Sequence, residues 1–372
     1  MRSLVLVAGI PIDDVTMAEA VDRVAMFVEE GRFSGRNHQI ATVNVDFVVT
    51  GCGDPELGSI LQRADLTIPD GMPVVWASKL FGRPVRERVA GADLVPELAA
   101  LSAQHDYSMM LFGSAPGVAE SVAATLAARH PGLRIVGYGG PMFDRGNEID
   151  DEVLDVVRTA APDILCVALG HPKQEYWIDA YRDKLDVPVL IGVGGSLDFI
   201  AGTKSRAPVW IREIGLEWLH RLATEPRRLA KRYARGFVRF APLVFRQFRA
   251  MGIRANAWAA PAVERVGDAV VVRPTGGLDI WASVDAFDRG GAFVVGTRVV
   301  VDMSRIGRLD QVTAASLVAL DYELRHAGSL LVLAAMPASS ARQLGRLQLD
   351  KVFTTVPALA SALEPSRFPV NR

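Results

Sequence analysis

A single carboxylate, Asp70, follows the short apolar run at 66–68 and stands between a proline and a glycine. We expect the run to form a buried strand that the Pro-Asp-Gly sequence ends. The carboxyl end of a strand in an α/β sheet is where side chains reach the ligand crevice, and a lone carboxylate there can take a proton from a hydroxyl group. The alternative is that Asp70 only forms a turn with Gly71, since Asp-Gly is a common turn dipeptide. The charged loop at 86–88 favours the catalytic interpretation.

Three glycine-containing loops each follow an apolar run and precede a helical pattern. They are GSAPG at 113–117, GHPKQE at 170–175 and GGSLD at 194–198. A strand, a tight turn and a helix N-terminus form a ready site for phosphate, although an ordinary strand-to-helix turn has the same pattern. We predict that the three loops converge on one crevice of a sheet. The candidate residues are Gly113, Ser114, Gly117, Gly170, Lys173, Gln174, Glu175, Gly194 and Asp198.

Two polar residues, Thr42 and Asn44, alternate along another expected strand and therefore point the same way. An asparagine in a buried sheet needs hydrogen-bond partners. A bound ligand and a neighbouring loop can supply them equally well, and the sequence leaves both alternatives open.

The segment at 221–254 carries ten Lys and Arg residues against one Glu, although the whole chain has a formal net charge of only −1. Arg221, Arg228 and Lys231 recur on one face of the expected helix. An aromatic and aliphatic stripe accompanies them, formed by Tyr233, Phe237, Phe240, Val244 and Phe248. A basic helix with an apolar stripe suits an anionic membrane surface, whereas the alternative is that the stripe packs on the protein itself.

Composition excludes several other classes. Two cysteines give neither a disulfide framework nor a metal-ligand spacing, and the six histidines form no HxxxH or HxH pattern, so we expect no metal site. No apolar stretch approaches the roughly 18–20 residues of a membrane-spanning helix. The apolar run near the N-terminus is short and lacks a small-residue cleavage site, so we interpret it as a strand. We expect a cytoplasmic protein.

The order of the apolar runs and helical patterns predicts an α/β fold with a largely parallel sheet and helices on both faces. A second, smaller α/β unit follows a stretch rich in alanine. We expect four parts: a core at 1–220, a basic amphipathic appendage at 221–254, a flexible linker at 255–262 and the smaller unit at 263–372. On this view, residues 1–254 alone would carry the activity.

Seven motifs occur in the order found in the WecG/TagA/CpsF family of bacterial glycosyltransferases, which residues 5–235 resemble. These are GIPID at 9–13, TVNVD at 42–46, PDG at 69–71, ERVAG at 87–91, ALGHPKQE at 168–175, GVGGSLDFIAGTKSRAPVW at 192–210 and GLEWLHRLATEPRRLAKRY at 215–233. The resemblance implies an inverting enzyme of cell-surface polysaccharide synthesis that requires no metal or other cofactor. It would move an N-acetylhexosamine, hexuronic acid or hexose from a UDP-sugar to a polyprenyl-diphosphate-linked saccharide.

The resemblance also assigns roles to residues of this chain. Asp70 would be the catalytic base, and Thr42, Asn44 and Arg88 would line the acceptor site. The three loops would hold the nucleotide, and Arg221, Arg228 and Lys231 would close over the donor diphosphate. Lys231 stands where the family pattern leads us to expect arginine, so bidentate contact is lost there while the charge remains. The enzyme would sit peripherally on the inner face of the cell membrane, with no nucleic-acid partner. Whether it forms a homo-oligomer is left open.

Residues 262–364 resemble a STAS domain, the fold of anti-sigma-factor antagonists. The match is carried by VVVDMSRI, RLDQVTAASLVAL and LLVLAAMP. Such domains usually read Asp-Ser-Ser-Gly where this chain reads DQVT at 310–313, so Gln311 replaces the serine that would be phosphorylated. Thr313 and Ser316 remain candidate phosphate acceptors. We expect a docking role, with a protein partner contacting the surface at 310–316.

Two other function classes compete with this interpretation. The chain could be a STAS-type regulatory adaptor whose first domain senses a nucleotide, and turnover of a UDP-sugar would separate that class from an enzyme. A dinucleotide oxidoreductase is disfavoured by the absence of GxGxxG and of an acidic residue about 20 positions later.

Overall fold

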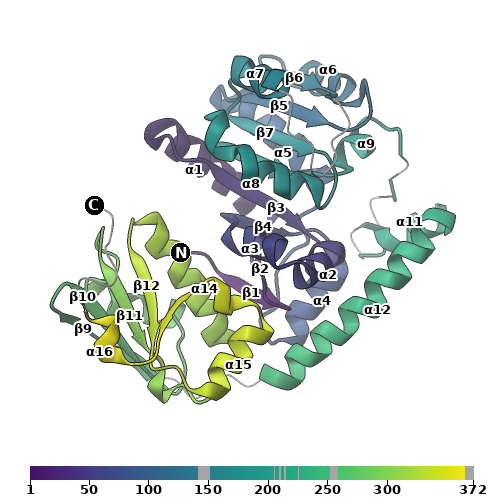
Figure 1. The fold of residues 1–372 in the computed structure, drawn as a ribbon. Coiled ribbons are helices and arrows are strands. Elements are labelled where there is room, and N and C mark those ends of the chain that lie inside the picture. The colour runs from purple at the N-terminus through teal and green to yellow at the C-terminus, as the bar shows by residue number, and fades with distance from the viewer. Residues whose placement is uncertain are drawn as a thin grey trace.

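The computed structural model describes residues 1–140, 151–204, 206–208, 211–212, 215–224, 226–251 and 259–364. It contains two α/β domains and a long helix that runs along the outside of the first one (Figure 1). Residues 255–258 of the predicted linker lie outside the described residues, and residues 259–262 belong to the first strand of the second domain.

The first domain is built on a six-stranded, all-parallel sheet in the order β4-β3-β8-β7-β5-β6. Its strands are short apolar runs, as buried parallel strands require. They are β3 (His38–Val43), β4 (Leu66–Pro69), β5 (Ser108–Gly113), β6 (Arg134–Tyr138), β7 (Ile164–Ala168) and β8 (Val189–Gly192). A separate antiparallel hairpin, β1 (Leu4–Val7) and β2 (Ile10–Asp13), precedes them, so the N-terminal apolar run is a strand as predicted.

Helices cover both faces of this sheet, which confirms the predicted fold class. Two buried clusters, one on each face, join the helices to the strands. The helices are α1 (Met17–Ser34), α2 (Val45–Gly53), α3 (Pro55–Arg63), α4 (Met72–Leu80), α5 (Gly91–His105), α6 (Val118–Arg129), α7 (Asp151–Ala160), α8 (Lys173–Leu185) and α9 (Ser196–Ile200). Two further helices, α11 (Glu217–Thr224) and α12 (Pro226–Met251), form the basic appendage.

The second domain has a five-stranded mixed sheet in the order β13-β12-β11-β10-β9, in which only the β9–β10 pair is antiparallel. Its strands are β9 (Ala259–Val266), β10 (Ala269–Thr275), β11 (Arg298–Asp302), β12 (Leu330–Ala334) and β13 (Thr354–Val356). Its helices are α13 (Val284–Arg289), α14 (Gln311–His326), α15 (Ala338–Arg346) and α16 (Leu359–Ala362), with short 3-10 turns at η1 (Trp281–Ser283), η2 (Met303–Arg305) and η3 (Leu349–Lys351).

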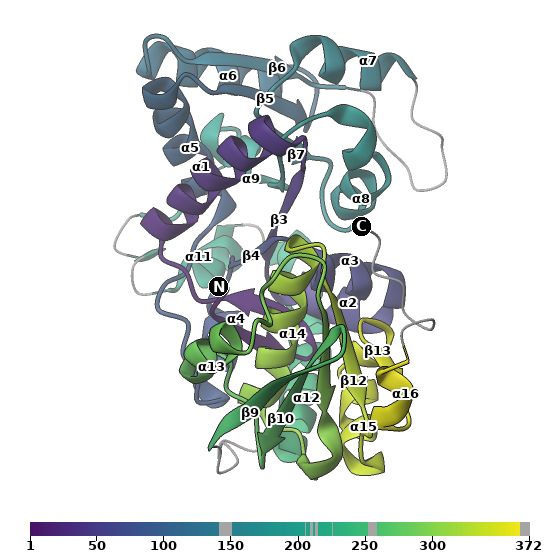
Figure 2. The ribbon, with the colours of Figure 1, turned by 90° about the vertical axis from the view of Figure 1, so that its left-hand side faces the viewer.

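One buried hydrophobic cluster spans the two domains. Strand β1 lies between α14 and the first domain in both views (Figures 1 and 2). Leu4 and Leu6 from β1 and Met251 from the end of α12 belong to the same buried cluster as the second domain's strands. Burying apolar surface is the main favourable term in folding, so this cluster couples the domains. The sequence predicted two units separated by a flexible linker, and it did not predict this shared core.

Buried polar contacts reinforce that interface. Gln311 at the start of α14 donates from Nε2 to the Leu6 carbonyl oxygen at 2.7 Å. Gln247 of α12 donates from Nε2 to the same carbonyl at 2.7 Å and to Gln311 Oε1 at 2.8 Å. Both glutamines are buried, so each contact satisfies a polar group that would be costly to leave unpaired.

Candidate active site

A cavity of about 590 Å³ lies beside the carboxyl ends of β3 and β4. Its walls come from the starts of α2 and α4, the loop after β8, and helices α11 and α12. Its charged and polar lining residues are Asn44, Asp46, Asp70, Arg88, Ser196, Arg206, Glu217, Arg221, Arg232 and Tyr233. Apolar side chains complete it, among them Met72, Trp76, Phe199, Trp218, Leu222 and Phe237. A cavity with convergent charged groups at this edge of a parallel sheet is where a ligand site is expected.

Asp70 follows β4 directly, and its backbone N–H donates to the Val43 carbonyl oxygen at 2.8 Å. Gly71 comes next and starts α4, so Asp70 sits at a strand-to-helix junction that faces the cavity. Burial raises the pKa of Asp70 to about 6, helped by the Glu217 charge and opposed by Arg88, Arg221 and a hydrogen bond from the Gly91 backbone. A carboxyl group with a pKa near the working pH is suited to general acid–base chemistry.

The charged loop at 86–88 divides between two roles. Arg88 lines the cavity and pairs with Glu217 at 3.4 Å and with Asp93 at 3.8 Å. Arg86 instead pairs with Asp14 at 3.1 Å, and Glu87 accepts the Met17 backbone N–H at 3.2 Å. Only the third residue of the loop therefore faces the cavity, while the other two hold the start of α1.

Two carboxylates anchor the arginines of the cavity wall. Asp93 accepts from Arg206 at 2.7 Å and from Arg212 at 3.0 Å, in addition to its pair with Arg88. Glu217 lies 3.9 Å from Arg206 and closes the network. Sequence reasoning did not select Arg206, Glu217 or Asp93 as site residues, although all three lie in or beside motifs that it quoted. Asp93 pairs with Arg206, and Arg88 with Glu217, across more than 100 positions, which no local pattern reveals.

The two strand residues behave differently. Asn44 lines the cavity and caps α2, where its Oδ1 accepts the Asp46 backbone N–H at 3.0 Å. Thr42 is buried between strands, and its hydroxyl donates to the Gly192 carbonyl oxygen at 2.8 Å. The structure therefore places Asn44 at the cavity wall and Thr42 behind it.

The three predicted loops lie together and are joined by side-chain hydrogen bonds. Ser114 donates its hydroxyl to Asp198 Oδ1 at 3.0 Å, and the Gly194 N–H donates to Gln174 Oε1 at 2.9 Å. Gln174 also donates to Glu175 Oε1 at 2.7 Å, and both side chains are buried. None of the nine predicted loop residues lines the cavity itself, but Ser196 of the third loop does. The loops thus form the neighbouring part of the same sheet edge.

The appendage supplies part of the wall. Arg221 lines the cavity with its guanidinium 4.8 Å from the centre of the Phe199 ring. Arg232 also lines the cavity and pairs with Asp46 at 2.8 Å. Lys231 is exposed and is not among the lining residues, and the side chain of Arg228 lies outside the described residues.

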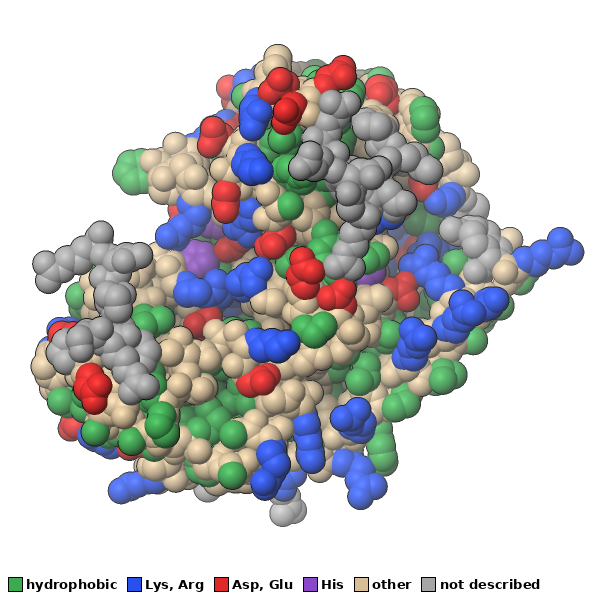
Figure 3. All heavy atoms as spheres, in the orientation of Figure 1, with side chains coloured by type: hydrophobic (Ala, Val, Ile, Leu, Met, Phe, Trp, Pro, Cys, Tyr) green, Lys and Arg blue, Asp and Glu red, His purple; other side chains and the backbone are tan. Residues whose placement is uncertain are grey.

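The apolar stripe of α12 splits into two groups. Phe240 and Val244 are buried in the core of the first domain, and Phe248 packs against the same cluster. Phe237 is 63% exposed, and its neighbours Val238 and Phe245 on the outer side are also exposed. Basic and apolar side chains follow this edge of the molecule (Figure 3). Packing on the protein therefore explains three of the five stripe residues, and the exposed side chains form a separate surface. Among the described residues, no helix combines the length and apolarity needed to cross a bilayer.

The sheet and its cavity define an α/β enzyme domain whose ligand crevice combines one carboxylate of raised pKa with several arginines. Residues 5–253 match the model of the "Glycosyl transferase WecG/TagA/CpsF family", and the chain belongs to that family. It is a glycosyltransferase, and residues 260–362 match the STAS domain model.

Similar proteins include enzymes named N-acetylglucosaminyldiphosphoundecaprenol N-acetyl-beta-D-mannosaminyltransferase. The one from Bacillus spizizenii is 35% identical over 190 residues, which cover 51% of this chain and 72% of that protein. The one from Bacillus subtilis is 33% identical over 188 residues, which cover 50% of this chain and 72% of that protein. The one from Staphylococcus aureus is 28% identical over 226 residues, covering 60% and 86%.

The STAS surface that we expected to meet a protein partner is largely buried: Gln311 contacts β1 and α12, whereas Thr313 and Ser316 are covered by the STAS domain's own residues 278–280. Gln311, Thr313 and Ser316 are all buried. Thr313 Oγ1 accepts the Leu278 backbone N–H at 3.0 Å, and Ser316 Oγ accepts that of Ile280 at 3.1 Å. Neither hydroxyl is accessible to a kinase in this structure, which corrects the expectation that they are candidate phosphate acceptors.

Proposed function

We propose that the cavity transfers an N-acetylhexosamine, in first place N-acetylmannosamine, from a UDP-sugar to a polyprenyl-diphosphate-linked saccharide with inversion. The observation that carries the proposal is the carboxylate of Asp70, with its pKa raised to about 6, inside a cavity walled by arginines. The names of the similar enzymes support the choice of sugar and acceptor. The product would be an intermediate of cell-surface polysaccharide.

Each part of the cavity has a task in this reaction. At pH 7 to 8 Asp70 is mostly ionised, so it can take the proton of the acceptor hydroxyl as the oxygen attacks the anomeric carbon. The departing UDP gathers negative charge, and Arg88, Arg206 and Arg221 stabilise it. Trp76, Trp218 and Phe237 line the cavity and are also exposed to solvent. In this reaction they contact the apolar part of the lipid-linked acceptor.

A panel of UDP-sugars tests the proposal. We expect the full-length chain to transfer N-acetylmannosamine to a polyprenyl-diphosphate-linked N-acetylglucosamine, detected as a mass increase of the lipid product. Turnover of UDP-glucose or a UDP-uronic acid instead would replace the sugar and keep the enzyme class. If no UDP-sugar is turned over on a lipid-linked acceptor, the proposed reaction is wrong, and the adaptor alternative gains support.

Glu217→Gln is expected to shift the pH dependence of kcat/KM. Removing this negative charge lowers the pKa of Asp70, because Glu217 raises it in the wild type. The acidic limb of the profile should therefore move from about pH 6 to lower pH. Glu87→Gln is the matched control, since Glu87 lies in the neighbouring loop and contacts the start of α1. An unchanged or upward-shifted limb in Glu217→Gln would mean that Asp70 does not control the profile.

Arg221→Ala is expected to reduce kcat by about 10²–10³-fold, the usual effect of removing one group that stabilises transition-state charge. Binding of UDP itself should weaken much less, because the charge develops as UDP leaves. Arg227→Ala, an exposed residue on the same appendage that does not line the cavity, serves as the control. A rise in KM with unchanged kcat would show that Arg221 only attracts the donor.

The outer face of α12 is expected to bind anionic membranes, which would hold the enzyme peripherally at the cytoplasmic face. Arg239, Arg246 and Arg249 are exposed there beside Phe237, Val238 and Phe245. Each basic residue near such a surface contributes about 1 kcal/mol, so a triple alanine variant should bind anionic vesicles roughly 100-fold more weakly. Alanine at Arg129, Arg158 and Arg289 removes the same charge elsewhere and is the control. Equal cosedimentation of the two triple variants would contradict the assignment.

A further inference from the structure

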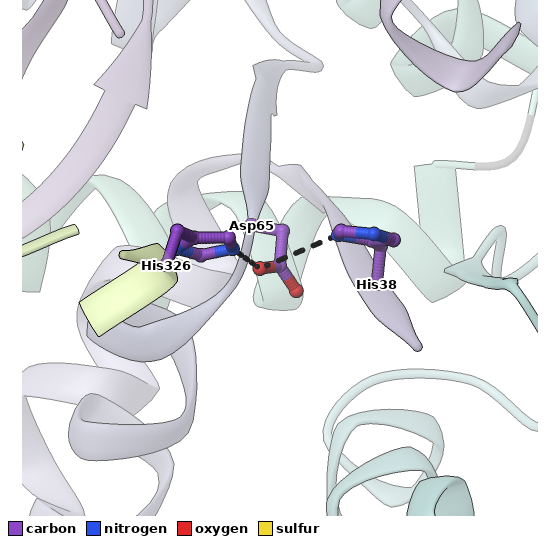
Figure 4. Close-up of side chains that lie close together, drawn as sticks. All are labelled: His38, Asp65 and His326. Carbon is purple, nitrogen blue, oxygen red and sulfur yellow. Dashed lines mark hydrogen bonds and ion pairs between the residues drawn. The ribbon is translucent and has the colours of Figure 1, made fainter. Parts of the chain in front are cut away.

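Three side chains from both domains meet at one point of the domain interface. His38 starts β3, Asp65 precedes β4, and His326 ends α14 of the STAS domain. Asp65 Oδ1 lies 3.0 Å from His326 Nε2 and 3.7 Å from His38 Nδ1, and the potential ligand atoms of the three residues all lie within 4.8 Å of one another. Figure 4 shows both rings directed at the same carboxylate.

His38 is fully buried, yet neither ring nitrogen has a hydrogen-bond partner among the described residues. The ring stacks on Phe27 with the centroids 4.2 Å apart, which fixes its orientation toward Asp65. Leaving a buried imidazole unpaired costs free energy, so such a group calls for an explanation, and an unseen ligand is one.

The hydrogen bonds of His326 also point to a cation. Its Nδ1 lies 2.8 Å from the Tyr322 carbonyl oxygen and must therefore carry a proton. In the neutral ring Nε2 then holds a lone pair, which would face the Asp65 carboxylate at 3.0 Å. A second proton on His326 would resolve this conflict but would leave His38 unsatisfied. A metal ion between the three groups satisfies all of them.

Surrounding groups orient the side chains of Asp65 and His38 for binding a metal ion. The Gln39 backbone N–H donates to Asp65 Oδ2 at 2.7 Å, and Arg182 lies 3.4 Å from the same oxygen, so Oδ1 is left for a ligand bond. Glu30 lies 3.7 Å from His38 Nε2, where it can orient the ring as carboxylates do behind metal-binding histidines.

We propose that His38 Nδ1, Asp65 Oδ1 and His326 Nε2 bind one Zn²⁺ ion that joins the STAS domain to the glycosyltransferase domain. Zinc prefers nitrogen and oxygen ligands at about 2.0–2.2 Å in a tetrahedron. Ligand atoms in that geometry lie roughly 3.3–3.5 Å apart, so the 3.0 and 3.7 Å separations from Asp65 require shifts of less than an ångström. The two histidine nitrogens lie within 4.8 Å of each other and would move closer together on binding the ion. A groove bordered by Asp65, His326 and Arg182 gives water access to the fourth position.

The test uses the full-length chain, freed of metal with a chelator and titrated with Zn²⁺ alone. We expect one equivalent to bind and the thermal midpoint to rise. At a free zinc concentration 100 times Kd, the ratio of folded to unfolded chain should increase about 100-fold. His326→Gln should weaken binding by more than about 100-fold, because loss of a supporting group alone costs 10–100-fold. His105→Gln, an exposed histidine, is the matched control and should bind like the wild type.

Glu30→Gln provides a second variant that leaves all three ligands in place on a partly exposed helix, so its folding is not at risk. We expect 10- to 100-fold weaker zinc binding in that variant. Co²⁺ in place of Zn²⁺ should give the intense visible absorption of a tetrahedral site, and His326→Gln should lose it. Failure of the wild type to bind zinc would overturn the proposal and leave a protonated His326 as the link. Unchanged binding in both His326→Gln and Glu30→Gln would also overturn it.

Discussion

Asp70→Asn is expected to reduce turnover by about 10²–10⁴-fold, the usual contribution of a general base. Asparagine has nearly the same shape, so the cavity should keep its form and UDP should bind as tightly as in the wild type. The control is Asp22→Asn on the exposed side of α1. A variant that retains more than about a tenth of the activity would return Asp70 to the role of a turn residue.

The same substitution is expected to stabilise the protein above pH 6. The pKa of Asp70 is raised to about 6 in the folded state, so the folded chain binds its proton more tightly than the unfolded chain does. Any stability that this proton contributes is present at low pH and is lost as the pH rises through 6, where the buried carboxylate ionises. Asparagine avoids that cost, and the free energy of unfolding at pH 7.5 should rise by about 1–2 kcal/mol. Denaturant unfolding at pH 4.5 and 7.5 measures the difference.

Removal of the STAS domain is expected to destabilise the first domain so strongly that most of it no longer folds. A chain ending at residue 254 would expose Leu4, Leu6 and Met251, which are buried with the second domain. Exposing a large apolar side chain costs about 1.5–3 kcal/mol, so three of them cost roughly 5–9 kcal/mol, comparable to the whole stability of a typical domain. This prediction replaces the expectation, drawn from the sequence, that residues 1–254 alone would carry the activity.

Cutting the folded chain between its domains distinguishes activity lost because the enzyme is less stable from activity lost for another reason. A protease site inserted at 252–258 allows the full-length protein to be cut after it has folded. We expect the cut chain to keep the STAS domain bound and to remain active, whereas the truncated chain should have a lower thermal midpoint and aggregate. If the truncated chain has the midpoint and kcat of the full-length protein, the shared core does not stabilise the enzyme.

Much of the fold follows from local sequence patterns. Each strand of the parallel sheet is a short apolar run, and the glycine loops mark the strand ends, so the α/β class and the meeting of the three loops were predictable. The position of Asp70 was predictable for the same reason, because it directly follows β4. Its catalytic role remains a prediction.

The rest depends on contacts between distant parts of the chain. Glu217 and Arg206 enter the cavity wall through ion pairs with Arg88 and Asp93, and their local sequence gives no sign of it. The apolar residues of α12 all recur at helical spacing. That spacing does not show which of them are buried, and the folded domain buries Phe240 while Phe237 is exposed. The histidine cluster has ligands up to 288 positions apart, from His38 to His326, so no spacing motif could indicate it.

The stereochemistry of the product tests the central claim most directly. A single base, Asp70, that activates the acceptor hydroxyl permits one direct displacement and therefore inverts the anomeric centre. With an α-linked UDP-N-acetylmannosamine donor, NMR of the isolated lipid product should show a β linkage, and Asp70→Asn should form it at least about 100-fold more slowly. An α linkage would mean retention, which a single displacement from the face opposite the leaving UDP cannot give, and it would contradict the account of this cavity.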